Sequence, residues 1–137
     1  MKAVHPKLIV GIGGSSGALN AYKALLDAMP HDTGMAFVVI SHLMPNAHSQ
    51  LAKILQRHTK MIVTVAADAM SILSNHVFVI PSDSDLTMDN YRFKVISPRT
   101  DRNKQVDLFF ISLANEMGAR AVGIILSGHF SDGTVGC

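Results

Sequence analysis

The sequence predicts an α/β fold built on a doubly wound, mainly parallel Rossmann-like sheet with one β-hairpin. Short apolar runs rich in β-branched residues alternate along the chain with amphipathic segments of helical spacing. The apolar runs lack polar alternation, which is typical of strands buried on both faces of a parallel sheet. The 137 residues fit one domain, residues 1–137, that is large enough to bury a core without disulfides or metals.

The first half of the chain supplies two strand–helix units and a third strand. We expect strands over 7–13, 35–40 and 61–65, because each is a short apolar run with glycine, proline or polar residues beside it. Apolar residues recur at three- and four-residue spacing over 16–29 and 49–58, which predicts helices there, the first ended by Pro30.

The second half adds the hairpin and the strongest helical pattern. We expect a strand over 76–80, a hairpin over 86–96 that turns at Asp89-Asn90, a helix over 106–117 with Gly118 at its C-terminus, and a strand over 121–126. The segment after this last strand is rich in glycine and serine, and the architecture calls for a further helix beyond it. The fold is therefore expected to be incomplete at its C-terminus.

Composition and charge exclude several classes of protein. Twelve Lys and Arg against ten Asp and Glu give a net charge of +2, too small to indicate a nucleic-acid partner. One cysteine, Cys137, excludes an internal disulfide framework and a cysteine-rich zinc module. No apolar run approaches the length of a membrane span, and the N-terminus lacks a signal-peptide core. We expect a soluble cytoplasmic protein without membrane insertion.

Three residues with hydrolytic chemistry follow three of the predicted strands. Ser15 follows the first strand, His42 the second and Asp132 the last. Ligands of open α/β sheets bind at the carboxyl ends of the strands, so these residues are expected on one rim. Serine, histidine and aspartate are the nucleophile, the base and the orienting acid of a catalytic triad.

The loop around Ser15 has the G-x-S-x-G pattern of a nucleophile elbow. Gly13, Ser15 and Gly17 form the pattern, and Gly14 and Gly17 would relieve crowding in the sharp turn. The backbone N–H of Ser16 would lie at a helix N-terminus and face a developing oxyanion. The alternative interpretation is a tight glycine-rich turn in which Ser16 caps the helix.

The same loop fits nucleotide binding less well. Gly11, Gly13 and Gly17 do not have the dinucleotide-binding spacing, and no acidic residue ends the second strand. A phosphate-binding loop would also need a Gly-Lys-Ser/Thr sequence, which is not present here.

Other histidines and carboxylates offer weaker alternatives. His129 is a rival base, because it shares a loop with Asp132, and His42, His129 and Asp132 together are a conceivable metal site without a recognised ligand spacing. Asp83 and Asp85 are interpreted as carboxylates that cap a turn.

Three motifs resemble the catalytic domain of the chemotaxis protein-glutamate methylesterases, the CheB type. They are residues 12–18 (IGGSSGA), residues 42–45 (HLMP) and residues 126–133 (LSG…SDG). The resemblance runs from about Leu8 to the end, and is greatest to the methylesterase-like domains of methylesterase/methyltransferase fusion proteins. The order serine, histidine, aspartate in this family matches Ser15, His42 and Asp132.

The resemblance implies hydrolysis of glutamyl γ-methyl esters on methyl-accepting chemotaxis receptors, yielding glutamate and methanol, and in some members glutamine deamidation. Ser15 would attack the ester, His42 would transfer the proton and Asp132 would orient the imidazole, without a cofactor or a metal. The receiver domain of two-domain members has no counterpart here, since about seven residues precede the first strand. The alternatives are a noncatalytic regulatory module that binds signalling proteins and a nucleotide-binding domain.

The chain departs from the family pattern at three places. Phe130 stands where the family has glycine beside the aspartate, and Ile111 stands where it often has arginine. The family domain also continues beyond the aspartate loop. Without that continuation, we expect apolar surface on the strand over 121–126, self-association through this edge, and little activity of the chain taken alone.

Overall fold

The structure is a computed structural model that describes residues 5–15, 18–42, 48–100 and 104–126. Its elements follow the order expected from the sequence. They are β1 (Ile9–Ser15), α1 (Leu19–Ala28), β2 (Ala36–His42), α2 (His48–Gln56), β3 (Ile62–Val65), β4 (His76–Val79), β5 (Asp85–Asp89), β6 (Arg92–Ile96), α3 (Gln105–Met117), the short 3-10 helix η2 (Gly118–Arg120) and β7 (Ala121–Leu126).

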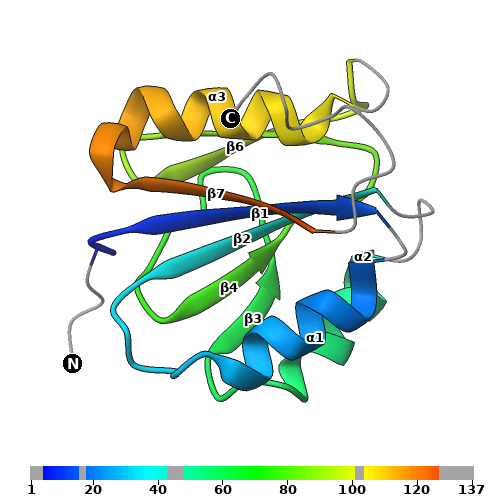
Figure 1. Cartoon of the computed structure of the whole chain (residues 1–137). Helices are drawn as coiled ribbons and strands as arrows, with labels where there is room; N and C mark the ends of the chain where they lie inside the picture. Colours follow the sequence, from blue (N-terminus) through cyan, green and yellow to red (C-terminus); the bar gives the residue numbers. More distant parts are fainter. Residues whose placement is uncertain (1–4, 16–17, 43–47, 101–103, 127–137) are drawn as a thin grey trace.

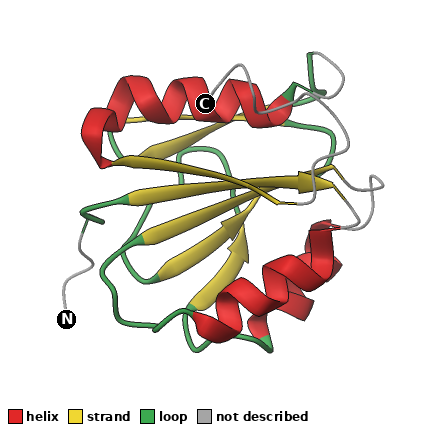
Figure 2. Cartoon of the chain, in the orientation of Figure 1, coloured by secondary structure: helices red, strands yellow, loops and turns green. Residues whose placement is uncertain are grey.

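Five of the strands form one parallel sheet in the order β3-β4-β2-β1-β7. Helix α3 covers one face of this sheet, and α1 and α2 cover the other (Figure 1). The hairpin β5-β6 is a separate antiparallel pair, visible in yellow on the α3 side of the main sheet in Figure 2. The predicted fold class, a doubly wound parallel sheet with one hairpin, is therefore confirmed.

The sheet buries a hydrophobic cluster on each face. The cluster on the α3 side contains four buried phenylalanine rings, and Phe93 of the hairpin lies between Phe78 of β4 and Phe109 of α3. The cluster on the other side joins α1 and α2 to the sheet through Tyr22 and Leu55. Apolar residues on both faces explain why the strand sequences show no polar alternation.

The glycines of β1 allow α3 to approach the sheet closely. A Cβ atom at Gly13 would lie 2.5 Å from Cγ1 of Val106, and one at Gly11 would lie 2.7 Å from the ring of Phe110. Val106 precedes Phe110 in α3, whereas Gly13 follows Gly11 in β1, so the helix runs antiparallel to the strand. The first turn of α3 consequently lies over the carboxyl end of β1 (Figure 1).

This close approach predicts a size-dependent coupling between Gly13 and Val106. Gly13→Ala should lower the free energy of unfolding by about 1–3 kcal/mol, because the new methyl group overlaps the Val106 side chain. In urea denaturation, Gly13→Ala combined with Val106→Ala should cost less than the sum of the two single changes, by about 1 kcal/mol. Additive costs would contradict the contact.

Most predicted boundaries differ from the structure by one to three residues, and those at the ends of β1 and β2 and at the start of α1 bear on the candidate site. Strands β1 and β2 extend two residues further than expected and end at Ser15 and His42, because parallel pairing continues to their ends. Helix α1 begins at Leu19, with Ala18 as its N-cap, and the predicted start at Ser16 lies outside the described residues.

Candidate active site

Ser15 and His42 lie opposite each other at the carboxyl edge of the sheet. Ser15 is the last residue of β1, His42 is the last residue of β2, and their Cα atoms are register partners. Neighbouring strands lie about 4.8 Å apart, so the two backbones are adjacent. The expectation that both residues share one rim is confirmed, although each is a strand residue rather than a loop residue.

The other predicted catalytic positions lie outside the described residues. These are Asp132, the third triad member, Ser16 and Gly17 of the elbow, and the rival base His129. The departure at Phe130 and the cysteine at the chain end also lie there. Among the residues that the structure does describe, no group of three histidine, cysteine or acidic side chains is arranged to hold a metal ion.

Gly14 lies directly before the candidate nucleophile, at a position without room for a side chain. A Cβ atom there would lie 2.4 Å from the hydroxyl oxygen of Tyr22 and 3.0 Å from the carbonyl oxygen of Leu126. Glycine is therefore required by the packing of β1 between α1 and β7. The role of Gly14 in the turn at Ser15 stays a prediction.

The side chain of Tyr22 in α1 lies against the carboxyl ends of both β1 and β2. Its buried hydroxyl donates a hydrogen bond of 3.2 Å to Oγ of Ser41, the residue before His42. Gly14 and Ser41 are themselves register partners, so the tyrosine hydroxyl lies against the pair that precedes Ser15 and His42. Burial raises the pKa of Tyr22 to about 12, and the hydrogen bond with Ser41 acts in the opposite direction.

The raised pKa of Tyr22 predicts a loss of stability at alkaline pH. Below pH 10 the hydroxyl is protonated in the folded and the unfolded state. Between pH 10 and about 12 the unfolded state releases this proton and the folded state keeps it, so stability falls as the pH rises. The shift of about two pKa units corresponds to roughly 3 kcal/mol at most.

Tyr22→Phe isolates this contribution from the other groups that titrate above pH 10. Urea denaturation between pH 9 and pH 12 should show a smaller loss of stability in Tyr22→Phe than in the wild type. The same pH dependence in both proteins would show that the phenol is not the group responsible.

The first turn of α3 brings buried polar groups to the same edge. Gln105 and Asp107 are 4% and 5% exposed, and Val106 between them packs on Gly13. The N-terminal end of a helix carries a partial positive charge. The edge that holds Ser15 and His42 therefore faces the positive end of α3.

Asp85 is a buried polar residue near this edge, and its role differs from the one predicted from the sequence. Asp83 is exposed and lies 3.8 Å from Arg99 in a turn with a positive φ of 48°, as a turn carboxylate should. Asp85 instead opens β5, is 3% exposed, and accepts hydrogen bonds from Thr100 and Gln105. Its turn-capping assignment is wrong, because its partners lie 15 and 20 residues away. Its position directly before the apolar run of the hairpin was the available signal.

In the part of the chain that the structure describes, we found no helix with the length and apolar character needed to cross a membrane. The second strand ends in Ile40, Ser41 and His42, so the nucleotide-binding alternative gains no acidic ribose ligand from this position.

Comparison with known proteins identifies relatives among the protein-glutamate methylesterases. The sequence model of the CheB methylesterase family matches residues 10–137. A protein-glutamate methylesterase/protein-glutamine glutaminase of Xanthomonas oryzae pv. oryzae is 36% identical over 134 residues, which cover 93% of this chain and 37% of the relative. A protein of the same description from Yersinia pestis is 31% identical, with 93% and 38% covered. The chain thus spans well under half the length of these relatives.

A solved structure is similar as well. The CheB methylesterase catalytic domain of Thermotoga maritima superposes with a TM-score of 0.83, over 94% of this chain and 71% of that domain. The sequence identity in this superposition is 24%, so the likeness concerns the fold.

Proposed function

The chain belongs to the CheB methylesterase family, and on this premise we propose that it carries the serine and histidine of a hydrolase for protein glutamyl γ-methyl esters. The observation that carries the proposal is the register pairing of Ser15 with His42 at the carboxyl edge. The pairing makes the two backbones neighbours, and a nucleophile and its base must come from neighbouring positions.

The proposed reaction proceeds by acyl transfer. The Ser15 hydroxyl attacks the ester carbonyl while His42 removes its proton, which gives a tetrahedral intermediate. Collapse of this intermediate breaks the bond to the methoxy oxygen, which takes the proton from His42 and leaves as methanol, and an acyl-serine ester remains. Water then attacks this ester with His42 as base, and glutamate and the free serine are released. Asp132 orients the imidazole and stabilises its cation.

The oxyanion of both tetrahedral intermediates needs hydrogen-bond donors. We assign this role to the backbone N–H of Ser16, with Gly14 and Gly17 providing a turn that brings the backbone close. The nearby positive end of α3 favours negative charge at this edge. All of this chemistry uses side chains and backbone of the protein, and no cofactor or metal enters the scheme.

The partner in this proposal is a methyl-accepting chemotaxis receptor or a similar signalling protein. Such a substrate places the reaction in the cytoplasm, and residues 1–137 then form part of one methylesterase-like α/β domain. Glutamine deamidation is the corresponding side reaction, because an amide carbonyl can replace the ester carbonyl in the same attack.

Release of methanol from a methylated receptor fragment tests the proposal. The assay should compare this chain with a chain extended at its C-terminus to the length of the family domain, and should follow ammonia release from receptor glutamines in parallel. Methanol release that depends on Ser15 would support the hydrolase. Receptor binding without methanol or ammonia release by either protein would instead favour the noncatalytic binding module.

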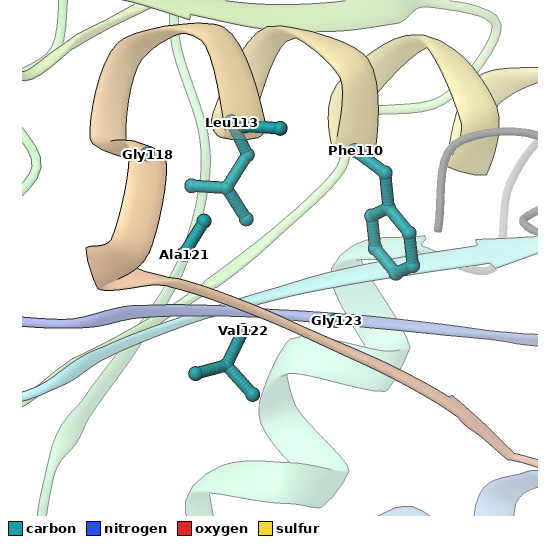
Figure 3. A pocket seen from close by; sticks show the side chains of 7 residues that line it. Phe110, Leu113, Gly118, Ala121, Val122 and Gly123 are labelled. Atoms are coloured by element: carbon teal, nitrogen blue, oxygen red, sulfur yellow. The ribbon is translucent and has the colours of Figure 1, made fainter.

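Self-association belongs to the same proposal and is supported by the edge strand β7. Within the described sheet, β7 pairs with β1 alone, and Val122 is 37% exposed. A cavity of about 220 Å³ lies between β7 and the end of α3. Its lining residues, most of them labelled in Figure 3, are Phe110, Leu113, Ala114, Gly118, Ala121, Val122 and Gly123. A strand with one open edge in the described sheet, beside a cavity lined by apolar side chains, favours pairing with a second copy.

A lysine on β7 should oppose this association. Val122→Lys should shift the chain toward a monomer in sedimentation equilibrium, because a charged side chain on an edge strand disfavours strand pairing. Ile62→Lys is the matched control, since Ile62 is 58% exposed on β3 at the opposite edge of the sheet. A monomeric wild type, or a shift with Ile62→Lys alone, would contradict association through β7.

A further inference from the structure

A buried carboxylate joins three segments next to the candidate active site. Both oxygens of Asp85 are used: Oδ2 accepts from the backbone N–H of Thr100 at 2.9 Å and from its hydroxyl, and Oδ1 accepts from the side-chain amide of Gln105 at 3.2 Å. We call Asp85, Thr100 and Gln105 the Asp85 cluster. It connects the start of β5, the segment between β6 and α3, and the first residue of α3.

A short series of contacts leads from this cluster to Ser15. Gln105 is followed in α3 by Val106, whose side chain packs on Gly13 closely enough to exclude a Cβ atom there. Gly13 lies two residues before Ser15, which is one full repeat of the strand. The position of the first turn of α3 therefore bears directly on the end of β1.

Two further sets of hydrogen bonds hold the hairpin on α3, and neither uses a buried charge. Oγ of Ser112 donates to the carbonyl of Met88 at 3.0 Å and accepts from its N–H at 2.8 Å. One turn further along, the carboxylate of Glu116, an exposed residue, accepts from the N–H of Asn90 at 2.8 Å. Away from the functional edge, a neutral or an exposed group thus suffices to hold the hairpin on the helix.

A buried charge contributes little net stability to a protein. Removing a carboxylate from water costs several kcal/mol, and its hydrogen bonds must offset that cost. Neutral groups of similar shape often give the folded state as much stability. Hydrogen bonds to a carboxylate are shorter and stronger than neutral ones, so they hold their partners more rigidly. Rigid placement is what the residues around a nucleophile require.

We propose that Asp85 is a positioning residue for Ser15. It fixes the first turn of α3 against β1, and through Val106 and Gly13 it holds the end of the strand in place for nucleophilic attack. The inference rests on the proposed hydrolase function and extends it to a residue that touches neither the substrate nor the reacting atoms.

Asp85→Asn tests this role, because the change keeps the shape and removes the charge. The kcat for methanol release should fall at least about tenfold while KM stays within about twofold, since a displaced nucleophile slows the chemistry more than it weakens binding. Thr100→Val should give a smaller fall in kcat, and Thr100→Ser, which retains the hydroxyl, should keep the wild-type rate. If Asp85→Asn does not fold, the Thr100 pair carries the test.

Ser112→Ala is the matched control, because it removes the neutral tie between the same two elements. It should lower the melting temperature, yet its kcat should equal that of the wild type at temperatures where both proteins are folded. Hydrogen exchange provides a readout that needs no substrate: the Thr100 amide should exchange faster in Asp85→Asn and at the wild-type rate in Ser112→Ala.

The outcomes separate this inference from the function on which it rests. A wild-type kcat in Asp85→Asn and Thr100→Val, in a protein that releases methanol, would overturn the positioning role and leave the hydrolase intact. An equal loss of kcat in Ser112→Ala would also overturn it, because a general effect of stability would then explain the data. Absence of esterase activity both in this wild-type chain and in a chain extended to the length of the family domain would contradict both proposals.

Discussion

Ser15→Ala and His42→Ala should each lower the rate of methanol release by at least about a thousandfold. The serine supplies the oxygen that forms the acyl ester, and the histidine moves the proton in each step, so neither step proceeds efficiently without both. The double variant should be scarcely slower than either single one, because the two residues act as a unit. Initial rates on a methylated receptor fragment measure all three variants.

Asp132→Asn and Cys137→Ser complete this comparison. Asp132→Asn should be as slow as the serine variant or somewhat faster, because it removes control of the imidazole tautomer and leaves the nucleophile in place. Cys137→Ser should keep the wild-type rate, since the proposed chemistry does not use this thiol. Full activity of Ser15→Ala would exclude Ser15 as the nucleophile, and a strictly multiplicative double variant would argue against joint action with His42.

Phe109→Ala should lower the free energy of unfolding by about 3–5 kcal/mol. The Phe109 side chain is completely buried where α3 meets the hairpin, with its ring centroid 6.5 Å from that of Phe93. Truncation removes the apolar surface of the ring and leaves a cavity between the helix and the hairpin. The midpoint of urea denaturation measures the loss.

Ile111→Ala provides the control on the same helix. Its side chain is 45% exposed, so its truncation should change stability by less than about 1 kcal/mol. Comparable losses for Phe109→Ala and Ile111→Ala would mean that α3 does not pack on the sheet and the hairpin through the face described above.

The order and type of the elements follow from the sequence because their signals are local. Apolar runs such as 35–40 form strands of the sheet, and the helical stripe over 106–117 forms α3 with Gly118, at a φ of 54°, as its C-cap. Each pattern reflects a periodicity or a backbone preference that acts within a few residues. The hairpin was predictable for the same reason, since Asn90 favours a turn. Its predicted turn at Asp89-Asn90 is wrong by one residue: Asp89 pairs with Arg92 in the ladder, and the turn residues are Asn90 and Tyr91, with φ of 51° and 61°.

The candidate site was predictable in part. A parallel sheet brings the carboxyl ends of its strands to one edge, which is why the strand pattern alone predicts that Ser15 and His42 share a rim. The register pairing of Ser15 with His42 could not be predicted in the same way, because it depends on β1 and β2 being neighbours in the sheet order. That order results from the packing of helices on both faces, and it cannot be inferred from the sequence of either strand.

The sequence by itself determined the fold class and the identity of the strands and helices, because these depend on local periodicity. It also determined that Ser15 and His42 lie at one edge of the sheet, because the carboxyl ends of parallel strands share that edge. Only the tertiary structure decided the roles of the buried polar residues. Asp85 has the sequence context of a turn carboxylate, yet it bonds Thr100 and Gln105 across 15 and 20 residues. The reason is physical: a buried carboxylate is defined by the donors around it, and chain distance does not indicate which donors folding will bring.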